Sequence, residues 1–268
     1  MRIISWNINS VRLRMDMLKK IVKRFKPDIL CLQETKCPND LFPHQDFYDM
    51  GFRYSFAYGI KGYNGVSIAS KINSTKNNKK KFCNKDDGRH ISVNLSYRNK
   101  VITVHNFYVP AGGDIPDPNI NEKFKHKLDF LDEATNWFSK KSGKDKSLIA
   151  LVGDINIAPD IMDVWSHKQL TNIVSHTKIE RIKMELFKRS FNFEDAIRNI
   201  HGYEKKIYSW WSYRARDWKK SNRGRRLDHI WTSKKLNEYL VNANIIENAR
   251  GWKRPSDHVP MVADFKIK

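Results

Sequence analysis

The stretch "LIALVGDINIAPD", residues 148–160, begins as a buried strand and then presents a carboxylate and a carboxamide two positions apart. Successive side chains of a strand point to opposite faces, so Asp154 and Asn156 share one face if the extended conformation continues that far. A polar turn explains the same letters, because Asp and Asn commonly close strands and Pro159 follows shortly. The stretch by itself is compatible with a turn or with a site, and the rest of the chain has to decide.

Short runs of β-branched and aromatic residues recur along the chain and predict strands. These runs cover residues 2–8, 28–34, 52–58, 65–70, 90–97, 101–109, 148–155, 227–233 and 261–267. Apolar residues at helical spacing predict helices within 11–25 and 124–138, and a third helix is expected over 178–189. No Gly/Ser/Pro-rich linker and no internal repeat divides the 268 residues. We therefore expect one α/β domain over residues 1–268.

Polar side chains stand at the ends of several predicted strands, where a core strand does not need them. These residues are Asn7, Asn9, Gln33, Glu34, Asn106, Tyr108, Asp154, Asn156, Asp228, Asp257 and His258. A single strand-end Asn is usually a turn residue, and a single Asp–His pair is usually structural. Ligands of layered α/β folds gather where strand ends meet loops, so the repetition favours one shared site over separate turns.

The chemistry of this set follows from its oxygen atoms. Carboxylates come from Glu34, Asp154, Asp228 and Asp257, and neutral oxygens come from Asn7 and Asn156. Such hard ligands suit Mg²⁺ or Mn²⁺ rather than zinc. His258 adds a group that titrates near neutral pH. The chain contains neither a GxxxxGK phosphate loop nor a GxSxG nucleophile elbow. The remaining chemistry is metal-assisted attack of water on a phosphodiester.

The overall charge indicates a polyanionic partner. Lys and Arg number 50 against 29 Asp and Glu, which gives a net charge of +21. Nucleic acid is the preferred interpretation, and an acidic membrane surface is the main competitor. A Lys-, Asn- and Ile-rich proteome bias also raises the charge, and "KINSTKNNKKKF" (71–82) has that character.

Cysteine usage and hydropathy indicate the cellular compartment of the protein. Cys31, Cys37 and Cys83 have no CxxC spacing, so we expect free thiols and neither a zinc site nor a disulfide framework. No apolar run approaches the ~18 residues of a membrane span, and "MRIISWNINS" lacks the apolar stretch of a signal peptide. We therefore expect a soluble, cytoplasmic protein with no membrane partner.

Motifs along the whole chain carry a family resemblance. In order they are "WNINSVR", "LQETK", "GR" at 88–89, "NFYVPAGG", "GDIN", "SWWSYR", "GRRLDHIW" and "SDHVP". This set resembles the exonuclease III family of abasic-site DNA repair endonucleases, within the endonuclease/exonuclease/phosphatase superfamily. The superfamily also holds DNase I-like nucleases, inositol polyphosphate phosphatases and sphingomyelinases. "LQETK", "SWWSYR" and "RLDHIW" carry the narrower resemblance.

The resemblance implies a DNase I-like, four-layered α/β sandwich. Two mainly antiparallel β-sheets pack face to face with helices outside, and the site lies at one end. The implied cofactor is one or two Mg²⁺ ions, with Mn²⁺ as a possible substitute. Glu34 is the main implied ligand, and Asn7 and Asp257 lie near the metal. The full implied metal set is Asn7, Glu34, Asp154, Asn156, Asp257 and His258.

The resemblance also implies catalytic roles. Asp154 orients or deprotonates the attacking water, and Asn156 holds the phosphate and stabilises the transition state. His258 contacts the scissile phosphate while paired with a carboxylate. Tyr108 lies near the phosphate or the leaving oxygen, and Asp228 supports the catalytic network. These roles offset the charge of the phosphodiester, whose anionic oxygens otherwise repel a nucleophile.

Substrate-binding residues follow from the same motifs. Trp210 and Trp211 would line a pocket for a base-free deoxyribose flipped out of the duplex. Arg89 matches a strand-grasping arginine, and the basic residues within 214–226 would contact backbone phosphates. Trp218 fits either this surface or a core strand followed by a solvated loop.

Three departures from the family pattern concern the pocket. His229 stands where relatives often carry Tyr or an aliphatic residue, and Trp211 stands where the bacterial type can have Phe. The loop "PAGGDIPDPN" (110–119) also differs from the best-known bacterial form. The balance between exonuclease activity and abasic-site cleavage is therefore open at this point.

The sequence thus predicts a monomeric, Mg²⁺-dependent DNA repair nuclease. It would cut 5′ of abasic sites and remove 3′ blocking groups or nucleotides from duplex DNA, and it would associate with the nucleoid when bound to DNA. A superfamily phosphatase acting on a soluble or lipid phosphate is one alternative. A non-catalytic DNA-binding module is the other, although degenerate relatives of that kind would be expected to lose Glu34, Asp154 or His258.

Overall fold

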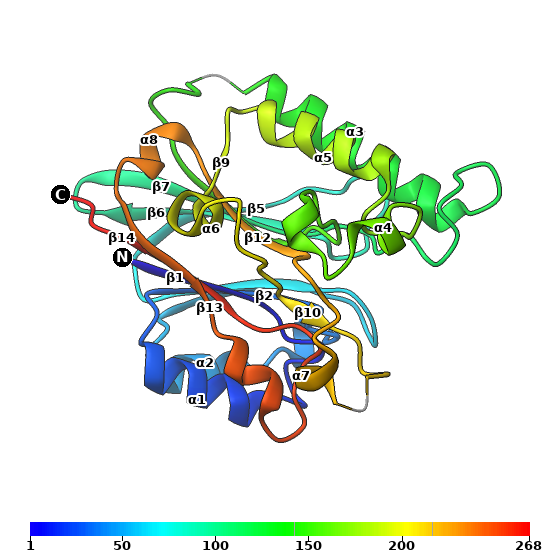
Figure 1. The fold of residues 1–268 in the computed structure, drawn as a ribbon. Coiled ribbons are helices and arrows are strands. Elements are labelled where there is room, and N and C mark those ends of the chain that lie inside the picture. The colour runs from blue at the N-terminus through cyan, green and yellow to red at the C-terminus, as the bar shows by residue number, and fades with distance from the viewer. Residues whose placement is uncertain (142, 216) are drawn as a thin grey trace.

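Two six-stranded β-sheets pack face to face in the computed structural model, which describes residues 1–141, 143–215 and 217–268 (Figure 1). The first sheet has the order β13 (Leu240–Ile245), β14 (Met261–Phe265), β1 (Arg2–Asn7), β2 (Ile29–Gln33), β4 (Val66–Ser70) and β3 (Tyr54–Tyr58). The second has the order β5 (Ser74–Lys79), β6 (His90–Tyr97), β7 (Lys100–Tyr108), β8 (Leu148–Asp154), β12 (Asp228–Thr232) and β9 (Glu194–Asp195). A short ladder joins β10 (Trp210–Trp211) to β11 (Gly224–Arg225).

Helices cover the outer surface of each sheet, which completes four layers (Figure 1). The first sheet is covered by α1 (Met15–Phe25) and α2 (His44–Asp49), and the second by α3 (Glu122–Ser139) and α5 (Lys178–Arg189). Shorter helices are α4 (His167–Leu170), α6 (Ala196–His201), α7 (Trp218–Ser221) and α8 (Lys234–Asn237), with 3₁₀ turns η1 (Asn39–Leu41), η2 (Ile161–Asp163) and η3 (Glu247–Gly251). The predicted layered α/β sandwich is confirmed.

The central strands are buried on both faces, and this explains their unbroken apolar sequences. In β2, Ile29 and Cys31 face the core between the sheets, whereas Leu30 and Leu32 face the helices of the first layer. In β8 the alternation repeats, with residues 150 and 152 in the central core and residues 149 and 151 against α3 and α5. Period-two alternation therefore produces three apolar layers from the two sheets.

Two strand pairs run parallel within sheets that are otherwise antiparallel. β1 pairs with β2 in parallel, and β7 pairs with β8 in parallel. Parallel neighbours finish at the same edge, so the ends of these four strands lie at one end of the sandwich. This topology places the polar strand ends together.

Every strand expected from the sequence is present, with ends within two residues of the expected bounds. The helix expected over 178–189 is α5, which begins with a capping box between Thr177 and Glu180. The first helix begins at Met15, because Val11 packs in the loop before it.

The short strands β9, β10 and β11 and the edge strands β5 and β13 were not predicted. The segment 71–82, whose composition suggested a proteome bias, contains β5. This strand pairs only with β6 and exposes most of its polar side chains. An exposed edge strand needs no apolar alternation, and lysines on it discourage pairing with other chains.

The cysteine prediction is confirmed, since Cys31, Cys37 and Cys83 are all free. Cys31 and Cys37 are buried and pack in the apolar cores. Within the described parts of the chain, none of the helices combines the length and the apolar character needed to cross a bilayer.

Candidate active site

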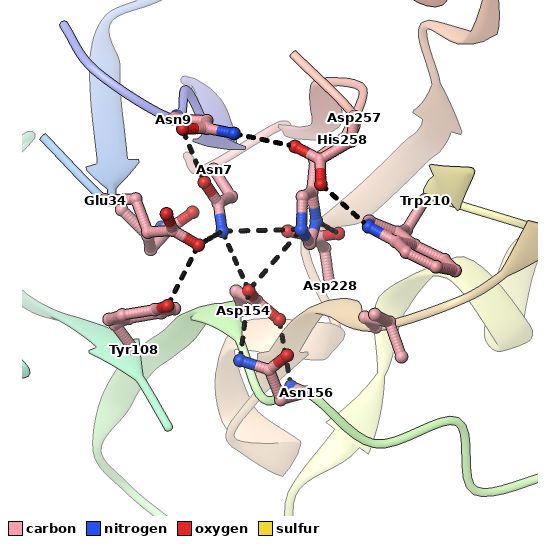
Figure 2. A network of polar contacts seen from close by, with 12 residues as sticks. Asn7, Asn9, Glu34, Tyr108, Asp154, Asn156, Trp210, Asp228, Asp257 and His258 are labelled. Carbon is pink, nitrogen blue, oxygen red and sulfur yellow. Dashed lines mark hydrogen bonds and ion pairs between the residues drawn. The ribbon is translucent and has the colours of Figure 1, made fainter. Parts of the chain in front are cut away.

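The polar strand ends meet in one hydrogen-bonded network between the two sheets (Figure 2). Asn7 ends β1 and Glu34 follows β2, while Tyr108 ends β7 and Asp154 ends β8. The Asn7 amide links the sheets, because its Nδ2 donates to Glu34 Oε1 over 2.9 Å and to Asp154 Oδ2 over 2.8 Å. The face-to-face packing of the sheets therefore builds the site.

Glu34 occupies a strained position and keeps its charge. Its φ of 48° lies in the left-handed region, which a non-glycine residue adopts at a cost of about 1–3 kcal/mol. Its Oε1 accepts the Tyr108 hydroxyl over 2.9 Å, and the Lys36 Nζ lies 3.0 Å from Oε2. Burial raises the pKa of Glu34, but Asn7 and Lys36 outweigh this effect and bring the pKa below its ordinary value. Glu34 is thus an ionised carboxylate within the network at neutral pH.

His258 and Asp228 form a buried pair. His258 Nδ1 lies 2.7 Å from Asp228 Oδ2, and the Ser209 hydroxyl donates to the same oxygen over 2.6 Å. Burial lowers the pKa of His258, but the carboxylates of Asp228 and Asp154 outweigh it and raise the pKa to about 10. The imidazole is therefore a cation at neutral pH. Its Nε2 lies 3.7 Å from Asp154 Oδ2, on the side facing the centre of the network.

The "GDIN" stretch is both a turn and part of the network. β8 ends at Asp154, and Asn156 has a φ of 56°, so the extended conformation does not continue to Asn156. The backbone N–H of Asn156 donates to Asp154 Oδ1 over 2.9 Å, and its Nδ2 donates to Asp154 Oδ2 over 3.2 Å and to the Val109 carbonyl over 2.9 Å. The two side chains meet through this turn, not through a shared strand face.

The carboxyl of Asp154 and the phenol of Tyr108 differ in proton affinity. Burial raises the pKa of Asp154 to about 7; His258 opposes this shift, and Asp228 adds to it. Burial and then the charges of Glu34 and Asp154 raise the pKa of Tyr108 well above its ordinary value. Asp154 can therefore exchange a proton near neutral pH, whereas Tyr108 remains a hydroxyl donor.

Asp257 precedes His258 and turns its carboxylate toward the first sheet and the β10 strand (Figure 2). Asn9 Nδ2 donates to Asp257 Oδ1 over 3.0 Å, and Trp210 Nε1 donates to Asp257 Oδ2 over 3.0 Å. Burial raises the pKa of Asp257, but the His258 cation and these two donors bring it below its ordinary value.

The donor set fits a hard divalent cation. Carboxylates outnumber cationic side chains in the network, and Asp228 Oδ1 is buried without a hydrogen-bond partner among the described residues. Ligand atoms of Asp154, Asp228 and His258 lie within 4.8 Å of one another. His258 Nδ1 and Asp228 Oδ2 already pair with each other, so the oxygens of Glu34, Asp257 and Asn7 are the better donors for a metal.

A cleft of about 610 Å³ opens onto the network. Its lining includes residues of the network, Glu34, Tyr108, Asn156, Asp257 and His258, and also Trp165, Trp210, Leu227, Arg214, Arg223 and Arg225. Its walls thus combine carboxylates, aromatic rings and arginines.

Trp210 and Trp211 do not share this cleft. They are neighbours in β10, so their side chains point to opposite faces. Trp210 lines the cleft, whereas Trp211 is only 2% exposed, packs against Tyr208 and Trp218, and donates to Asn222. The expectation that both rings line one pocket is wrong for Trp211.

His229 lies outside the pocket as well. It is fully buried beside Asp228, and its Nε2 lies 2.9 Å from the Ile157 carbonyl. Its departure from the family pattern therefore concerns the core behind the "GDIN" turn. Trp218 begins α7 and packs on Trp211 and Arg250, at the outer core of the first sheet.

The basic residues within 214–226 lie in different environments, and Lys219 and Lys220 are exposed on α7. Arg214, Arg223 and Arg225 line the cleft, where they can meet phosphates. Arg226 is fully buried and bonds to Asp163 and Asp195, so the expectation of a phosphate contact is wrong for this residue. Arg216 also belongs to the expected set, and it lies outside the described residues.

Arg89 packs against Tyr108 at the border of the network. Its guanidinium sits 5.1 Å from the centre of the Tyr108 ring, pairs with Asp87 over 2.5 Å and donates to the Tyr108 carbonyl over 3.3 Å. The expected strand-grasping arginine therefore supports the backbone of Tyr108 in the free protein.

Gln33 and Asn106 also stand at strand ends, but they tie the sheets together. Gln33 Nε2 donates to Asn106 Oδ1 over 2.6 Å, and Asn106 Nδ2 donates to the carbonyls of Leu32 and Ser67. All of these groups are buried, so this pair is a structural crosslink next to the site.

Lys36, Ser209 and Trp165 contribute to the site but were not singled out in the sequence, whereas Asn9 was noted as a strand-end residue. Asn9 and Lys36 connect Asp257 to Glu34, since Lys36 Nζ donates to Asn9 Oδ1 over 2.6 Å. Ser209 fixes Asp228, and Trp165 lines the cleft. Lys36 and Ser209 lie inside the quoted "LQETK" and "SWWSYR" motifs, which is the signal that could have identified them.

Comparison with known proteins agrees with this geometry. The model of the Endonuclease/Exonuclease/phosphatase family matches residues 4–258. The chain is 30% identical to exodeoxyribonuclease III of Haemophilus influenzae, over 99% of this chain and 100% of that one.

Two solved structures superpose along the full length of both chains. One is an AP endonuclease from Archaeoglobus fulgidus, with a TM-score of 0.91 and 32% identity. The other is a 3′ phosphatase from Neisseria bound to product DNA hairpin, with a TM-score of 0.90 and 27% identity. The chain therefore belongs to the endonuclease/exonuclease/phosphatase family, and within it to the group of exodeoxyribonuclease III and AP endonucleases.

Proposed function

We propose that this chain hydrolyses phosphodiester bonds 5′ of abasic sites and removes 3′ blocking groups or nucleotides from duplex DNA. The chain is a hydrolytic nuclease of DNA repair, and its family is metal-dependent. The observation that carries the proposal is the single network in which Glu34, Asp154 and His258 meet beside a cleft walled by tryptophan and arginine.

The proposed metal is Mg²⁺, with Mn²⁺ as a substitute, in one or two positions. Glu34 would be the main ligand, Asn7 and Asp257 would lie beside it, and the remaining members of the set are Asp154, Asn156 and His258. When bound, a divalent cation offsets the charge of the phosphate and polarises it for attack. The oxygen-rich donor set and its excess of carboxylates support this assignment.

Asp154 is the proposed base. Its raised pKa, about 7, suits a group that orients a water molecule and takes its proton near neutral pH. Tyr108 holds its own proton more tightly, so its proposed role is to donate a hydrogen bond near the leaving oxygen. The key proton is therefore assigned to Asp154.

His258 and Asn156 are the proposed phosphate-binding groups. Asp228 holds the imidazole in its charged form, which leaves the Nε2–H free to donate to a phosphate oxygen. Asn156 uses its amide on Val109 and Asp154 in the free protein, so it would exchange one of these bonds for a phosphate oxygen. Such fixed donors are worth more in a desolvated site than in water.

The rest of the proposal concerns the whole protein. We propose that residues 1–268 act as one catalytic domain, as a monomer in the cytoplasm, associated with the nucleoid when bound to DNA. The net charge of +21 supports a DNA substrate over a lipid or inositol phosphate.

A duplex with one internal abasic site tests the function directly. With Mg²⁺, we expect one incision 5′ of the site that leaves a 3′-hydroxyl, and EDTA should abolish it. Asp154→Asn is the matched inactive variant, and an inositol polyphosphate is the control substrate. Phosphate release from the inositol compound without DNA incision would favour the phosphatase alternative. DNA binding without any incision would favour a non-catalytic module.

A further inference from the structure

One wall of the cleft carries arginines stacked on tryptophans. The Arg225 guanidinium lies 5.4 Å from the Trp210 ring centre, and the Arg223 guanidinium lies 4.8 Å from that of Trp165. All four residues line the cleft that holds Glu34 and His258. The arginine side chains therefore contribute positive charge to a wall whose rings alone would be apolar.

Arg225 is fixed in this wall by neutral partners. Its Nη1 donates to the Val174 carbonyl over 3.1 Å and to Ser175 Oγ over 2.8 Å. Among the residues that the structure describes, no carboxylate lies within ion-pair distance of Arg225. A half-buried guanidinium without a counter-charge is unusual, because desolvation of a cation is costly unless an anion compensates it.

Trp210 connects Arg225 to Asp257 of the polar network. β10 and β11 pair Trp210 with Arg225, and Trp210 Nε1 donates to Asp257 Oδ2 over 3.0 Å. Arg225 is held on the ring of the same tryptophan. A substrate whose scissile phosphate lies at His258 and Asn156 would place its neighbouring group against this wall.

A neutral base-free sugar makes no use of a fixed positive charge. A carboxylate or phosphate does, because guanidinium binds both through paired, charge-assisted hydrogen bonds. We propose that Arg225 is a substrate-binding residue that recognises an anionic group carried beyond the scissile phosphate. This inference rests on the proposed function and names the substrate feature that the pocket selects.

Two sources can supply this anion. One is the carboxylate of a 3′-phosphoglycolate end, and the other is the chain phosphate on the 3′ side of an internal abasic sugar. In both reactions water attacks phosphorus and the P–O3′ bond breaks. The electron pair goes to O3′, which takes a proton, and the anionic group leaves with the phosphate.

Two substrate pairs separate these sources. The first compares a 3′-phosphoglycolate end with its neutral isostere, a 3′-phosphate esterified with 2-hydroxyethyl. The second compares an internal tetrahydrofuran abasic site with a 3′-terminal tetrahydrofuran, which lacks the following phosphate. For each pair, kcat/KM is measured for the charged and for the neutral substrate. The ratio of these two kcat/KM values is then compared among wild type, Arg225→Gln and Arg225→Lys.

We expect the wild-type ratio in at least one pair to fall by about tenfold or more in Arg225→Gln, as for the loss of a hydrogen bond to a charged group. Arg225→Lys should keep part of the ratio, because it keeps the charge but loses the fork. Arg98→Gln is the matched control: Arg98 is exposed, stacks on Tyr97 at the far end of β6 and β7, and should leave both ratios unchanged.

The pair that changes identifies the anion. Unchanged ratios in Arg225→Gln, or an equal loss on charged and neutral substrates, would overturn the inference and leave Arg225 as a support for the Val174–Ser175 backbone. Absence of cleavage of every substrate by the wild type would contradict the proposed function instead. These outcomes are distinguishable because the first two require an active enzyme.

Discussion

Two buried charge clusters lie next to each other in this protein and are built in opposite ways. The catalytic cluster comprises Asn7, Glu34, Asp154, Asp228, Asp257 and His258. The closed cluster comprises Asp163, Asp195, Arg198 and Arg226. Arg226 is separated by one residue from Asp228, the first residue of β12, so the segment that leads into β12 connects the two clusters.

The clusters differ in charge balance and in access. In the closed cluster two arginines face two aspartates, with Arg226 bonding to Asp163 over 2.6 Å and to Asp195 over 2.7 Å, and all four side chains are buried. In the catalytic cluster four carboxylates face one imidazolium, with Lys36 at the edge, and the cluster opens onto the cleft. A balanced set neutralises its own buried charges and suits a structural role, whereas an unbalanced set beside the cleft suits the cation and the phosphate that we propose it binds.

Removing an arginine from the closed cluster should have the largest effect. Arg226→Met leaves two buried aspartates without their main partner, so we expect a loss of about 3–5 kcal/mol in the free energy of unfolding. Urea denaturation measures it. Arg189→Met is the matched control, because Arg189 forms an exposed pair with Glu185 worth less than about 1 kcal/mol. Equal stability of the two variants would show that the closed cluster does not hold the fold.

The catalytic cluster should respond in activity. In Asp154→Asn or His258→Ala we expect kcat to fall by about 10²- to 10³-fold, the usual cost of one preorganised group. DNA binding should survive, and Asp154→Asn should not lower the free energy of unfolding, because it relieves repulsion among carboxylates. Single-turnover cleavage and urea denaturation measure the two quantities. Asp129→Asn on the exposed face of α3 is the control, and near-normal activity in Asp154→Asn would remove the residue from the mechanism.

This comparison also shows what the sequence can and cannot reveal. The catalytic cluster was predictable, because its members stand at strand ends where a core strand needs no polar group. The closed cluster was not, because Asp163 lies in a 3₁₀ turn, Asp195 in the two-residue strand β9 and Arg198 in the short helix α6, and the packing of such short elements depends on long-range contacts. Arg226 resembled its exposed neighbours in sequence, and only burial separates it from Arg225.

A second limit on prediction from sequence is that the direction of a side chain cannot be read from a very short strand. Period-two alternation could have separated Trp210 from Trp211, but β10 has only two residues and gives no pattern to read. At "GDIN" the same alternation was misleading, because the strand ends at Asp154 and a turn brings Asn156 back to it. From the sequence, a turn and a site were alternatives. They coexist, because the left-handed backbone conformation of Asn156 forms the turn that brings its side chain to Asp154.

A buried histidine pair, His90 and His105, extends the comparison. No carboxylate is paired with it among the described residues, and it does not line the cleft. His90 and His105 stack with ring centres 5.3 Å apart, their facing nitrogens are 3.0 Å apart, and both side chains are buried. Burial lowers the pKa of His90 to about 3, and the Lys141 and Lys80 charges act in the same direction. Burial, with His90 and Lys141, lowers the pKa of His105 well below its ordinary value.

The pair should make stability depend on pH. Below the ordinary histidine pKa of about 6.5, the unfolded chain takes up protons that the folded chain refuses, so stability falls as the pH decreases from that value toward 3. At one pH unit below 6.5, we expect a loss of about 1 kcal/mol for each histidine, measured by urea denaturation at pH 7.5 and pH 5.5. His105→Phe keeps the aromatic stack and removes one titrating group, so its change in stability between the two pH values should differ from that of the wild type by about 1 kcal/mol, in the direction of a smaller loss at pH 5.5. An unchanged loss in His105→Phe would assign the acid sensitivity to other groups, with His126 and His176, whose burial also lowers their pKa, as the first candidates.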